Sequence, residues 1–522
     1  MHPSVQEIAT THTPESLAEQ LCVERSVVVL RSALFDSPQA RYSFVAANPF
    51  LTLRSFGSRC EITYHASRVS HHVQFGNPWH VLDSLMARCE LLDEIDLPFP
   101  LGGCFGYWSY DLKNFVEPKL PRRAVNDLEL PDCHVGFYDS LVVFDHHLGT
   151  TCVVSTGLAA DGSRSEQRAR EQVEVWRRWL SSEPKPVLTA NRSLSERIKE
   201  TVTPARQRAS DSRLCESDRR LCSLPLREGQ SQGERVVSSN VTQAGLLSAI
   251  AHAQRYIRAG DIYQVNLSQR LAASSTFSGW EFFQRLLNVS PAPFAAYFDC
   301  GDFQIASSSP EQFLRLSGPH ITTRPIKGTR PRSLDATRDS QLAYELQTSP
   351  KELAELVMIT DLLRNDLGKV CEFGSVHVPS LARLERYPQV QHLVSTVEGR
   401  LRPDVTHFAA LASCFPGGSI TGAPKFRAME IIDELELNAR GPYCGCHGYL
   451  GFNRESQLSI SIRTAIHKKD TVYFHVGAGI VADSMPEAEF DETLAKAGGF
   501  FAALNLSLSP NSVPAHPASL HP

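Results

Sequence analysis

Two stretches that read as helices each carry two glutamates three residues apart, Glu352 with Glu355 and Glu489 with Glu492. Residues at this spacing share one face of a helix, and the face of the first pair continues into the apolar Ile359 and Leu362. Four carboxylates in one partly buried site would repel one another unless a cation neutralised them, and a set of oxygen ligands suits Mg²⁺. The alternative is ordinary surface charge, in which Glu492 and Lys496 form a helical ion pair.

Two glycine-containing segments could hold an anion through their backbone. The first, 415–425, runs into a predicted helix with Pro424 near its start, where free N–H groups and the helix dipole favour negative charge. It lacks the Gly-Lys-Ser/Thr ending of a phosphate-binding P-loop. The second contains Gly477, Ala478 and Gly479, whose N–H groups could meet a carboxylate. Either segment could equally be a structural turn.

Three single residues are further candidates. Lys327 lies between an isoleucine and a glycine. A lysine that loses solvent has a lowered pKa and becomes nucleophilic, although a surface lysine in a turn is the commoner case. Arg463 lies in the strand-like run 459–464, where a buried arginine needs an anionic partner, either a substrate carboxylate or a structural acid. His392 has apolar neighbours, a context in which a lone histidine is more often a hydrogen-bonded core residue.

The elements that must position these residues are short strands and longer helices. Strands are predicted at 27–30, 60–64, 140–144, 294–298, 303–308, 460–466 and 472–475. Helices are predicted at 166–179, 351–365 and 424–435. Thr242 is a plausible cap for one more helix, which ends at Gly260. Strands and long helices without strict alternation predict an α+β fold instead of a doubly wound sheet.

The composition is near the average for globular proteins. The 522 residues are 42% hydrophobic and 21% charged, and the net charge of −5 gives no electrostatic reason to expect a nucleic-acid partner. Thirteen cysteines without a Cys-x-x-Cys pair predict reduced thiols. The polar stretch 1–24 is unlike a signal peptide, and no apolar run is long enough to span a membrane. We therefore expect a cytoplasmic protein.

The segment 182–239 changes in character. Pro, Ser, Arg, Gln and Glu dominate it without a sustained apolar period, which predicts a flexible linker between a region at 1–181 and one at 240–508. A disordered tail is expected at 509–522. The arginines of the linker could suggest an RNA-binding arm, but they alternate with acids and serines, which favours a solvated segment.

Taken together, the segments that contain the candidate functional residues resemble the chorismate-binding enzymes. This family includes anthranilate synthase component I, aminodeoxychorismate synthase component I, and the isochorismate and salicylate synthases. The resemblance is dense over 254–500 and continues weakly upstream, at 41–44, 102–103 and 110–111. Further blocks stand in family order at 260–266, 309–311 and 361–366. The resemblance implies two packed, largely antiparallel β-sheets flanked by helices, with 240–508 as the chorismate-binding catalytic domain.

Within the family, Lys327 resembles the aminodeoxychorismate subtype, because anthranilate enzymes typically carry alanine at this position of Pro325–Thr329. The segments 417–421 and 293–296 are similar to the same subtype. The resemblance implies that chorismate and ammonia give 4-amino-4-deoxychorismate, on the route to 4-aminobenzoate and folate.

The resemblance also implies a role for each candidate. Lys327 would attack C2 of the chorismate ring as a covalent nucleophile. Glu311 would be the general acid for the departing C4 hydroxyl, with His392 and Ser419 lining the ring pocket. Mg²⁺ on the four glutamates would bind the ring carboxylate. The residues that would position the substrate carboxylates are Arg463, Tyr443, Lys496 and the backbone of Gly477, Ala478 and Gly479.

Two expectations concern other ligands. No segment resembles a glutaminase domain, so ammonia would come from a separate glutamine amidotransferase subunit in a heterodimer. Anthranilate relatives bind tryptophan between N-terminal strands, and a possible amino-acid site here comprises Ser32, Arg41, Tyr42 and Ser43. The alternatives are an anthranilate synthase component I, an isochorismate synthase and a catalytically inactive chorismate-binding protein; Lys327 and the glutamate pairs argue against them.

Overall fold

The computed structural model describes residues 2–32, 41–65, 69–91, 97–184, 237–387 and 390–506. Most of the predicted linker, 185–236, and the whole predicted tail lie outside these residues. The two ends of the linker are placed: Ser182 accepts a hydrogen bond at its carbonyl from His12 (2.9 Å), and Val237–Ser239 forms a strand.

Within the described residues, the strands form two sheets of twelve strands each, and every strand pairing is antiparallel. The first sheet runs in the order β1 (Ser4–Glu7), β10 (Thr150–Ser155), β9 (Ser140–Asp145), β3 (Tyr42–Ala46), β2 (Val28–Arg31), β13 (Phe294–Asp299), β14 (Gln304–Ser309), β23 (Thr464–Lys468), β24 (Thr471–Ile480), β12 (Gln264–Ser274) and β11 (Val237–Ser239), with β20 (Gly422–Ala423) also on β12.

The second sheet runs in the order β17 (Ile326–Pro331), β19 (Val390–Arg400), β16 (His320–Thr323), β15 (Gln312–Ser317), β22 (Glu455–Ile460), β21 (Cys446–Gly451), β7 (Gly103–Trp108), β8 (Cys133–Tyr138), β4 (Leu51–Phe56), β5 (Arg59–Tyr64) and β6 (Ser70–Phe75), with β18 (His377–Arg386) also on β19. The prediction of two largely antiparallel sheets in an α+β fold is confirmed.

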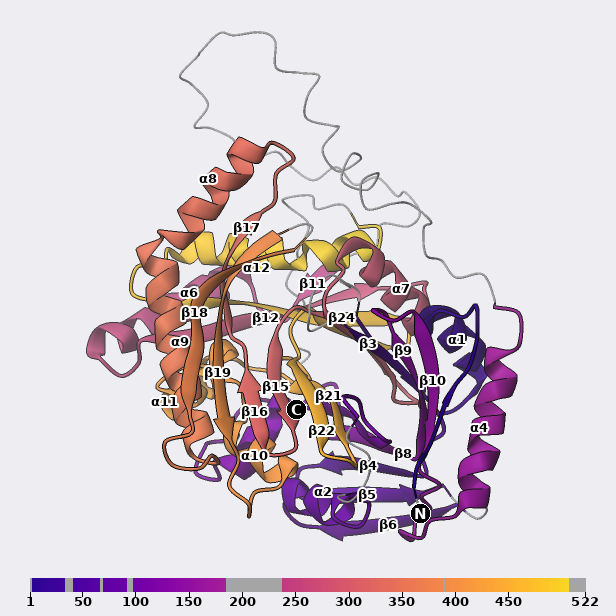
Figure 1. Ribbon diagram of the computed structural model, residues 1–522. Helices are drawn as coiled ribbons and strands as arrows, with labels where there is room; N and C mark the ends of the chain where they lie inside the picture. Colours follow the sequence, from indigo (N-terminus) through magenta and orange to yellow (C-terminus); the bar gives the residue numbers. More distant parts are fainter. Residues whose placement is uncertain are drawn as a thin grey trace, which may run out of the picture.

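Both sheets combine strands from the two ends of the chain. In the first, β2 pairs with β13, and in the second, β7 pairs with β21. Figure 1 shows the violet N-terminal strands side by side with the orange and yellow C-terminal ones. The sheets face each other across a shared core, where the ring of Phe44 on β3 meets Tyr449 on β21 edge-on at 5.2 Å between centroids. The regions 1–181 and 240–508 are therefore intergrown.

Helices cover the sheets and close their ends. Their bounds are α1 (Pro14–Gln20), α2 (Pro78–Met86), α3 (Lys113–Val116), α4 (Glu166–Leu180), α6 (Gln243–Ala259), α7 (Gly279–Val289), α8 (Ala336–Gln347), α9 (Pro350–Gly368), α10 (His407–Cys414), α11 (Lys425–Leu435) and α12 (Pro486–Ala503). Short 3₁₀ turns are η1 (Leu21–Val23), η2 (Tyr110–Leu112) and η4 (Gly418–Ile420).

The two helices with paired glutamates both begin at a proline. In α9 the hydroxyl of Ser349 caps the N–H of Glu352, and Pro350 and Pro486 occupy first-turn positions, where the missing N–H has no cost. α12 packs on β24, with the rings of Phe474 and Phe500 stacked at 4.4 Å. α9 packs on β17 and β19 at the end of the second sheet. Each sheet thus receives one of the acidic helices.

One strand prediction is wrong in a way that matters for the site. The run 460–466 is not a single strand: β22 ends at Ile460 in the second sheet, and β23 begins at Thr464 in the first. The residues between them carry the chain from one sheet to the other, and Arg463 has a φ of +49°. Strand propensity does not register this crossing, because it is set by which sheet each half of the run pairs with.

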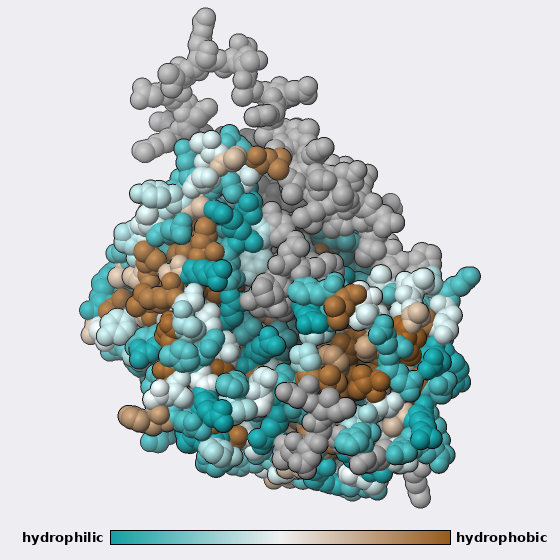
Figure 2. Space-filling view, in the orientation of Figure 1, coloured by the Kyte–Doolittle hydropathy of each residue, from teal (hydrophilic) through white to brown (hydrophobic). Residues whose placement is uncertain are grey.

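No helix among the described residues is long and apolar enough to cross a membrane. On the face shown in Figure 2, hydrophobic side chains gather in separate areas with hydrophilic surface between them.

Candidate active site

A cavity of about 620 Å³ lies where α9, α12 and the ends of both sheets meet. Its lining includes almost every residue that the sequence singled out: Lys327, Glu311, His392, Ser419, Arg463, Tyr443, Gly477, Gly479, Lys496, Glu352, Glu355, Glu489 and Glu492. Ala478 is not among the lining residues; it is fully buried, because successive side chains of β24 point to opposite faces.

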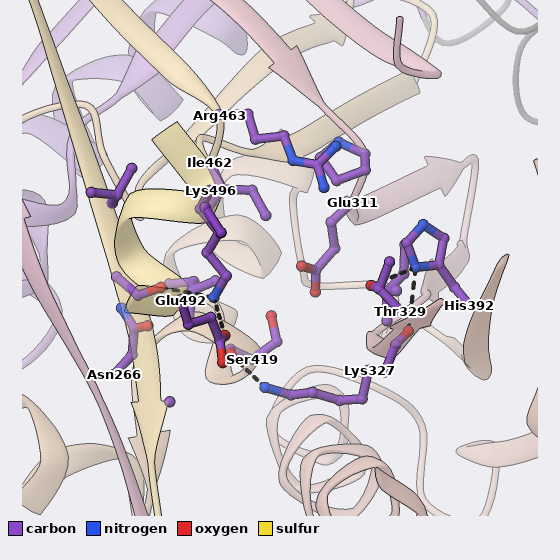
Figure 3. A pocket seen from close by; sticks show the side chains of 18 of the residues that line it. Asn266, Glu311, Lys327, Thr329, His392, Ser419, Ile462, Arg463, Glu492 and Lys496 are labelled. Atoms are coloured by element: carbon purple, nitrogen blue, oxygen red, sulfur yellow. Dashed lines mark hydrogen bonds and ion pairs between the residues drawn. The ribbon is translucent and has the colours of Figure 1, made fainter. Parts of the chain in front are cut away.

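Lys327 reaches the cavity from a bulge in β17. The register with β19 shifts between Lys327 and Thr329, and Gly328 adopts a φ of +66°, a conformation that favours glycine. A Cβ at Gly328 would lie 3.0 Å from Oε2 of Glu352, so the bulge brings the strand directly against α9. The Lys327 amine lies 3.5 Å from the carbonyl oxygen of Ser419 (Figure 3).

Glu311 is a buried acid beside this lysine. It lies between β14 and β15, with 6% of its surface exposed. Burial raises its pKa, while a hydrogen bond from Ser419, the charge of Lys327 and the N–H of Ile326 oppose the rise. A carboxyl group with a raised pKa can hold a proton for transfer. The role of Glu311 as the general acid stays a prediction.

Ser419 is held in place by a buried ion pair. The 3₁₀ turn η4 is part of a loop that begins after α10, and the amine of Lys425 donates to the carbonyl oxygens of Cys414 (3.0 Å) and Pro416 (2.9 Å). The same amine donates to the fully buried Asp366 of α9 at 2.5 Å. Lys425 therefore ties the loop with Ser419 to the helix with Glu352 and Glu355. Anion binding by this loop stays a prediction.

Arg463 has no described anionic partner. The structure records no ion pair for its guanidinium within the described ranges, and burial lowers its pKa. A buried cation without a partner is costly unless a ligand supplies the opposite charge. Of the two partners that the sequence left open, a structural acid is not found among the described residues, so this arginine is available for a carboxylate.

His392 is both a core residue and a cavity residue. Its Nδ1 lies 3.0 Å from the hydroxyl of Thr329 and 3.3 Å from the carbonyl oxygen of Gly328. Burial lowers its pKa to about 4, with the charge of Arg463 acting in the same direction. The ring is neutral at physiological pH and offers hydrogen bonds, not charge.

Glycines of β24 allow polar side chains to approach the strand. A Cβ at Gly477 would lie 2.6 Å from the hydroxyl oxygen of Tyr443, and one at Gly479 would lie 2.6 Å from Nε2 of Gln264. β23 pairs with β24 only as far as Phe474, which leaves this part of the strand edge open. The amine of Lys496 donates to the Gly477 carbonyl at 2.8 Å.

The four glutamates line one cavity but each has a separate partner. Glu352 pairs with Arg330 (3.4 Å) and Glu492 with Lys496 (2.8 Å), Glu355 accepts from Gln264 (3.4 Å), and Glu489 accepts from Ser484 (2.6 Å). Among the described residues, no three acidic, histidine or cysteine side chains are gathered tightly enough to hold a metal ion as they stand.

Two observations nevertheless fit a hard cation. Burial raises the pKa of Glu355; Lys327 and Lys351 lower it, while Glu352 and Glu489 repel its charge and raise it. The amide oxygen of Gln264, which lies beside Glu355, is buried without a hydrogen-bond partner. Carboxylates that repel one another and an amide oxygen that lacks a donor suit Mg²⁺ with its bound water.

The four N-terminal residues proposed for an amino acid lie elsewhere. Ser32 and Tyr42 line a separate cavity of only about 30 Å³ between the sheets. The hydroxyl of Ser43 accepts from the N–H of Ser32 at 3.1 Å, and Arg41 pairs with Asp145 at 2.7 Å. The structure thus brings two of the four to one small cavity, and neither Arg41 nor Ser43 lines it.

Other lining residues were not singled out from the sequence: Gln264, Asn266, Thr329, Arg330, Ile462 and His475. Gln264 and Asn266 occur two apart in the family-like block 260–266, and a strand places such residues on one face, which is a signal that could have found them. His475 carried no signal beyond its place two residues before Gly477.

Comparison with known proteins identifies the family. The model of the chorismate-binding enzymes matches residues 31–502. The chain belongs to this family. A relative from Acetivibrio thermocellus named anthranilate synthase component 1 is 35% identical over 95% of this chain and 93% of its own length. One from Salmonella typhimurium named aminodeoxychorismate synthase component 1 is 38% identical over 90% and 91%.

Solved structures agree with the fold of this chorismate-binding enzyme. The crystal structure of anthranilate synthase component I from Streptococcus pneumoniae matches with a TM-score of 0.68 and 28% identity, over 89% of this chain and 93% of that one. The isochorismate synthase MenF from Escherichia coli, at 17% identity and a TM-score of 0.63, shows the same fold. Relatives named anthranilate synthase component 1 and aminodeoxychorismate synthase component 1 are about equally similar to this chain, so overall identity does not distinguish between these two names.

Proposed function

We propose that the chain aminates chorismate at C4, as component I of an aminodeoxychorismate synthase. The observation that carries this proposal is the place of Lys327. Its amine lies in the cavity next to Ser419 and within the electrostatic reach of Glu311 and Glu355. A lysine beside a proton donor is suited to attack an electron-poor ring carbon and to leave again.

Substrate binding would use the unpaired positive charge of the cavity. The Arg463 guanidinium would pair with one carboxylate of chorismate, and Tyr443 would donate a hydrogen bond from its place over Gly477. Glu352, Glu355, Glu489 and Glu492 would hold Mg²⁺, with the free amide oxygen of Gln264 accepting from its water. The cation, when bound, supplies positive charge for the ring carboxylate.

The first chemical step forms a bond between the Lys327 nitrogen and C2 of the ring. Both ring double bonds shift by one position, the C4–O bond breaks, and Glu311 donates its proton so that the hydroxyl leaves as water. The raised pKa of Glu311 favours the protonated form that this step needs. The neutral His392, hydrogen-bonded to Thr329, would orient the leaving hydroxyl.

The second step restores the enzyme. Ammonia attacks C4, both ring double bonds shift back, and the bond between C2 and the lysine nitrogen breaks, so that its electron pair returns to Lys327. The new ammonium group gives one proton to the Glu311 carboxylate. Chorismate and ammonia have then become 4-amino-4-deoxychorismate and water. We propose that a separate glutamine amidotransferase subunit supplies the ammonia.

The test is product identification by liquid chromatography and mass spectrometry. Purified protein is incubated with chorismate, Mg²⁺ and ammonium, beside Lys327→Ala and a control, Lys119→Ala, which changes an exposed lysine outside the cavity. We expect aminodeoxychorismate from the wild type and the control, and none from Lys327→Ala. Without ammonium, the wild type and Lys119→Ala should each gain the mass of chorismate less one water, whereas Lys327→Ala should not.

The second candidate function is that of an anthranilate synthase component I, which the relative from Acetivibrio thermocellus favours. Anthranilate from the wild-type protein would establish it and overturn the C4 assignment. Binding of chorismate without turnover would instead identify a non-catalytic chorismate-binding protein.

A further inference from the structure

Arg440 is a buried arginine directly behind the lining of the catalytic cavity. Only 2% of its surface is exposed. Its ion-pair partner is Glu436, whose carboxylate accepts from Nε at 2.8 Å and from Nη2 at 2.7 Å. Glu436 is itself fixed to β12, because it accepts from the N–H of Ser268 at 2.8 Å and from its hydroxyl at 3.0 Å. The guanidinium is therefore anchored by charge-assisted hydrogen bonds.

Stability alone does not explain this ion pair. Taking two charges out of water costs free energy that their attraction only just returns, so apolar side chains of similar volume are often as stable at such a position. An arginine differs from them in offering five N–H donors in a rigid, planar fork. The role of Arg440 therefore depends on the groups that its remaining N–H donors reach.

These donors reach two segments of the cavity wall. Nη2 also donates to the carbonyl oxygen of Asn266 on β12 at 2.7 Å, and Nη1 donates to the carbonyl oxygen of Ile420 at 3.5 Å. Both residues line the catalytic cavity, and Ile420 directly follows Ser419 in η4. One side chain thus connects the first sheet with the loop that carries Ser419.

The guanidinium of Arg440 also lies against the ring of Tyr443. Its central carbon is 5.7 Å from the centre of the ring, within the range of a cation–π contact. The hydroxyl of this tyrosine is hydrogen-bonded to the side chain of Asn266. Arg440 therefore holds both partners of this hydrogen bond, the backbone of Asn266 and the ring of Tyr443.

The N-terminal region contributes a second aromatic ring to Arg440. The central carbon of the guanidinium is 4.7 Å from the centre of the Tyr110 ring in η2. The N–H of Tyr110 donates to the carbonyl oxygen of Gly441 at 2.9 Å, and the N–H of Gly441 donates to Asp111 at 2.9 Å. The region 1–181 thus reaches the wall of the catalytic cavity through Arg440.

We propose that Arg440 is a positioning residue that holds Tyr443 in the orientation needed to bind a carboxylate of chorismate. The inference rests on the proposed contact between Tyr443 and the substrate, but not on which ring carbon is aminated. Loss of the fork would release the tyrosine ring and its hydrogen-bond partner from each other. The affinity for chorismate would then fall, while Lys327 and Glu311 would stay in place.

The first test is Arg440→Lys, which keeps the charge but loses the planar fork. Calorimetry measures the Kd of chorismate with Mg²⁺ in a Lys327→Ala background, where no adduct can form. We expect this Kd to rise about tenfold. In the chain that retains Lys327, the KM for chorismate should rise by a similar factor, whereas kcat and the KM for ammonia should change much less.

The matched control is Arg170→Lys. Arg170 also pairs with a glutamate four residues away, Glu166, at 3.1 Å, but it lies on the exposed surface of α4. This variant should bind chorismate as the unaltered background does. Thermal unfolding of each variant shows whether it is folded.

A double-mutant cycle separates positioning from a general loss of structure. Where Tyr443→Phe has removed the hydroxyl, Arg440→Lys should change the Kd of chorismate by less than about threefold. An equal factor with and without the hydroxyl would overturn the inference, because Arg440 would then not act through Tyr443. A wild type that does not bind chorismate would instead overturn the proposed function, and the inference with it.

Tyr110→Leu takes the place of Arg440→Lys in the same cycle if the latter does not fold. It removes the aromatic ring from the guanidinium without touching the ion pair with Glu436. Tyr110→Leu should raise the Kd of chorismate more than Tyr110→Phe, which keeps the ring. Equal binding by these two folded variants would overturn the inference in that case.

Discussion

Gly477 and Tyr443 touch so closely that the strand residue cannot carry a side chain: a Cβ at position 477 would lie 2.6 Å from the tyrosine hydroxyl oxygen. This hydroxyl is also hydrogen-bonded to Asn266, and its ring lies on His475. The contact fixes one side of the catalytic cavity against β24.

Gly477→Ala should therefore displace Tyr443 and lower kcat/KM by on the order of a hundredfold, since small misplacements in an active site have effects of this size. The control is Gly498→Ala on α12, where a Cβ would meet nothing within 4 Å. In a helix this change should raise the free energy of unfolding by about 0.5–1 kcal/mol and leave the rate unchanged. Equal activity in the two variants would contradict the role given to Tyr443.

Glu311→Gln removes the proposed acid while preserving its shape. We expect kcat to fall by about 10²–10⁴-fold. In the wild type, the protonated carboxyl is the active form, so the rate should decrease as pH rises through the raised pKa of Glu311. The measurement is a profile of kcat against pH. The variant should lack this decrease in kcat. If the same decrease were seen in Glu311→Gln, the titrating group would be another residue.

Removal of Mg²⁺ should abolish turnover and weaken chorismate binding, because the carboxylates of α9 and α12 would then repel the substrate. Calorimetric titration of chorismate with and without a chelator measures the effect. Glu355→Gln should raise the Mg²⁺ concentration needed for half-maximal rate, whereas Glu171→Gln, on an exposed turn of α4, should not. Full activity after exhaustive chelation would rule out the metal.

Buried histidines should make the fold sensitive to acid. His407 has a pKa lowered to about 4 by burial, against 6.5 when unperturbed. Its unfolded form therefore binds more protons between these values, so stability is present above about pH 6.5 and is lost as pH falls toward 4. The shift in the pKa of His407 corresponds to a loss of about 3 kcal/mol in the free energy of unfolding, once the pH is below both values.

Urea unfolding at pH 7 and pH 4.5 tests this expectation. His407→Gln keeps a donor for the carbonyl of Gly318 but does not titrate. The free energies of unfolding measured at the two pH values should therefore differ less in this variant than in the wild type. His80→Gln, at an exposed position of α2, should leave the difference in the free energy of unfolding between pH 7 and pH 4.5 unchanged. A difference that is the same in both variants would show that His407 does not contribute.

Sequence and structure agree best where chemistry depends on residue type. The glutamate pairs follow from helical spacing, and Lys327 from its place between Ile326 and Gly328. Both predictions are local, and the cavity contains all five residues. The α+β class follows in the same way from strand and helix patterns that do not alternate, whereas the two antiparallel sheets were expected only from the resemblance to the chorismate-binding enzymes.

The part that could not be predicted depends on contacts between distant segments. Nothing near Asp366 in the sequence indicates that it binds Lys425, although this pair positions Ser419. The sequence predicts a continuous strand through Arg463, because isoleucines alternate with serines before it and threonine and isoleucine follow it. Its turn arises only because the two halves of that run belong to different sheets, which is a property of the whole fold.

The intergrown sheets have a consequence for how the protein is made. The partner of β2 is β13 and the partner of β7 is β21, and both partners are synthesised later. Neither sheet can therefore be completed while only the first half of the chain has left the ribosome. The emerging N-terminal strands would expose unpaired edges until late in synthesis, when a nascent chain is most prone to aggregate. An N-terminal fragment expressed alone should for this reason be insoluble, and co-expression with the remainder should rescue it.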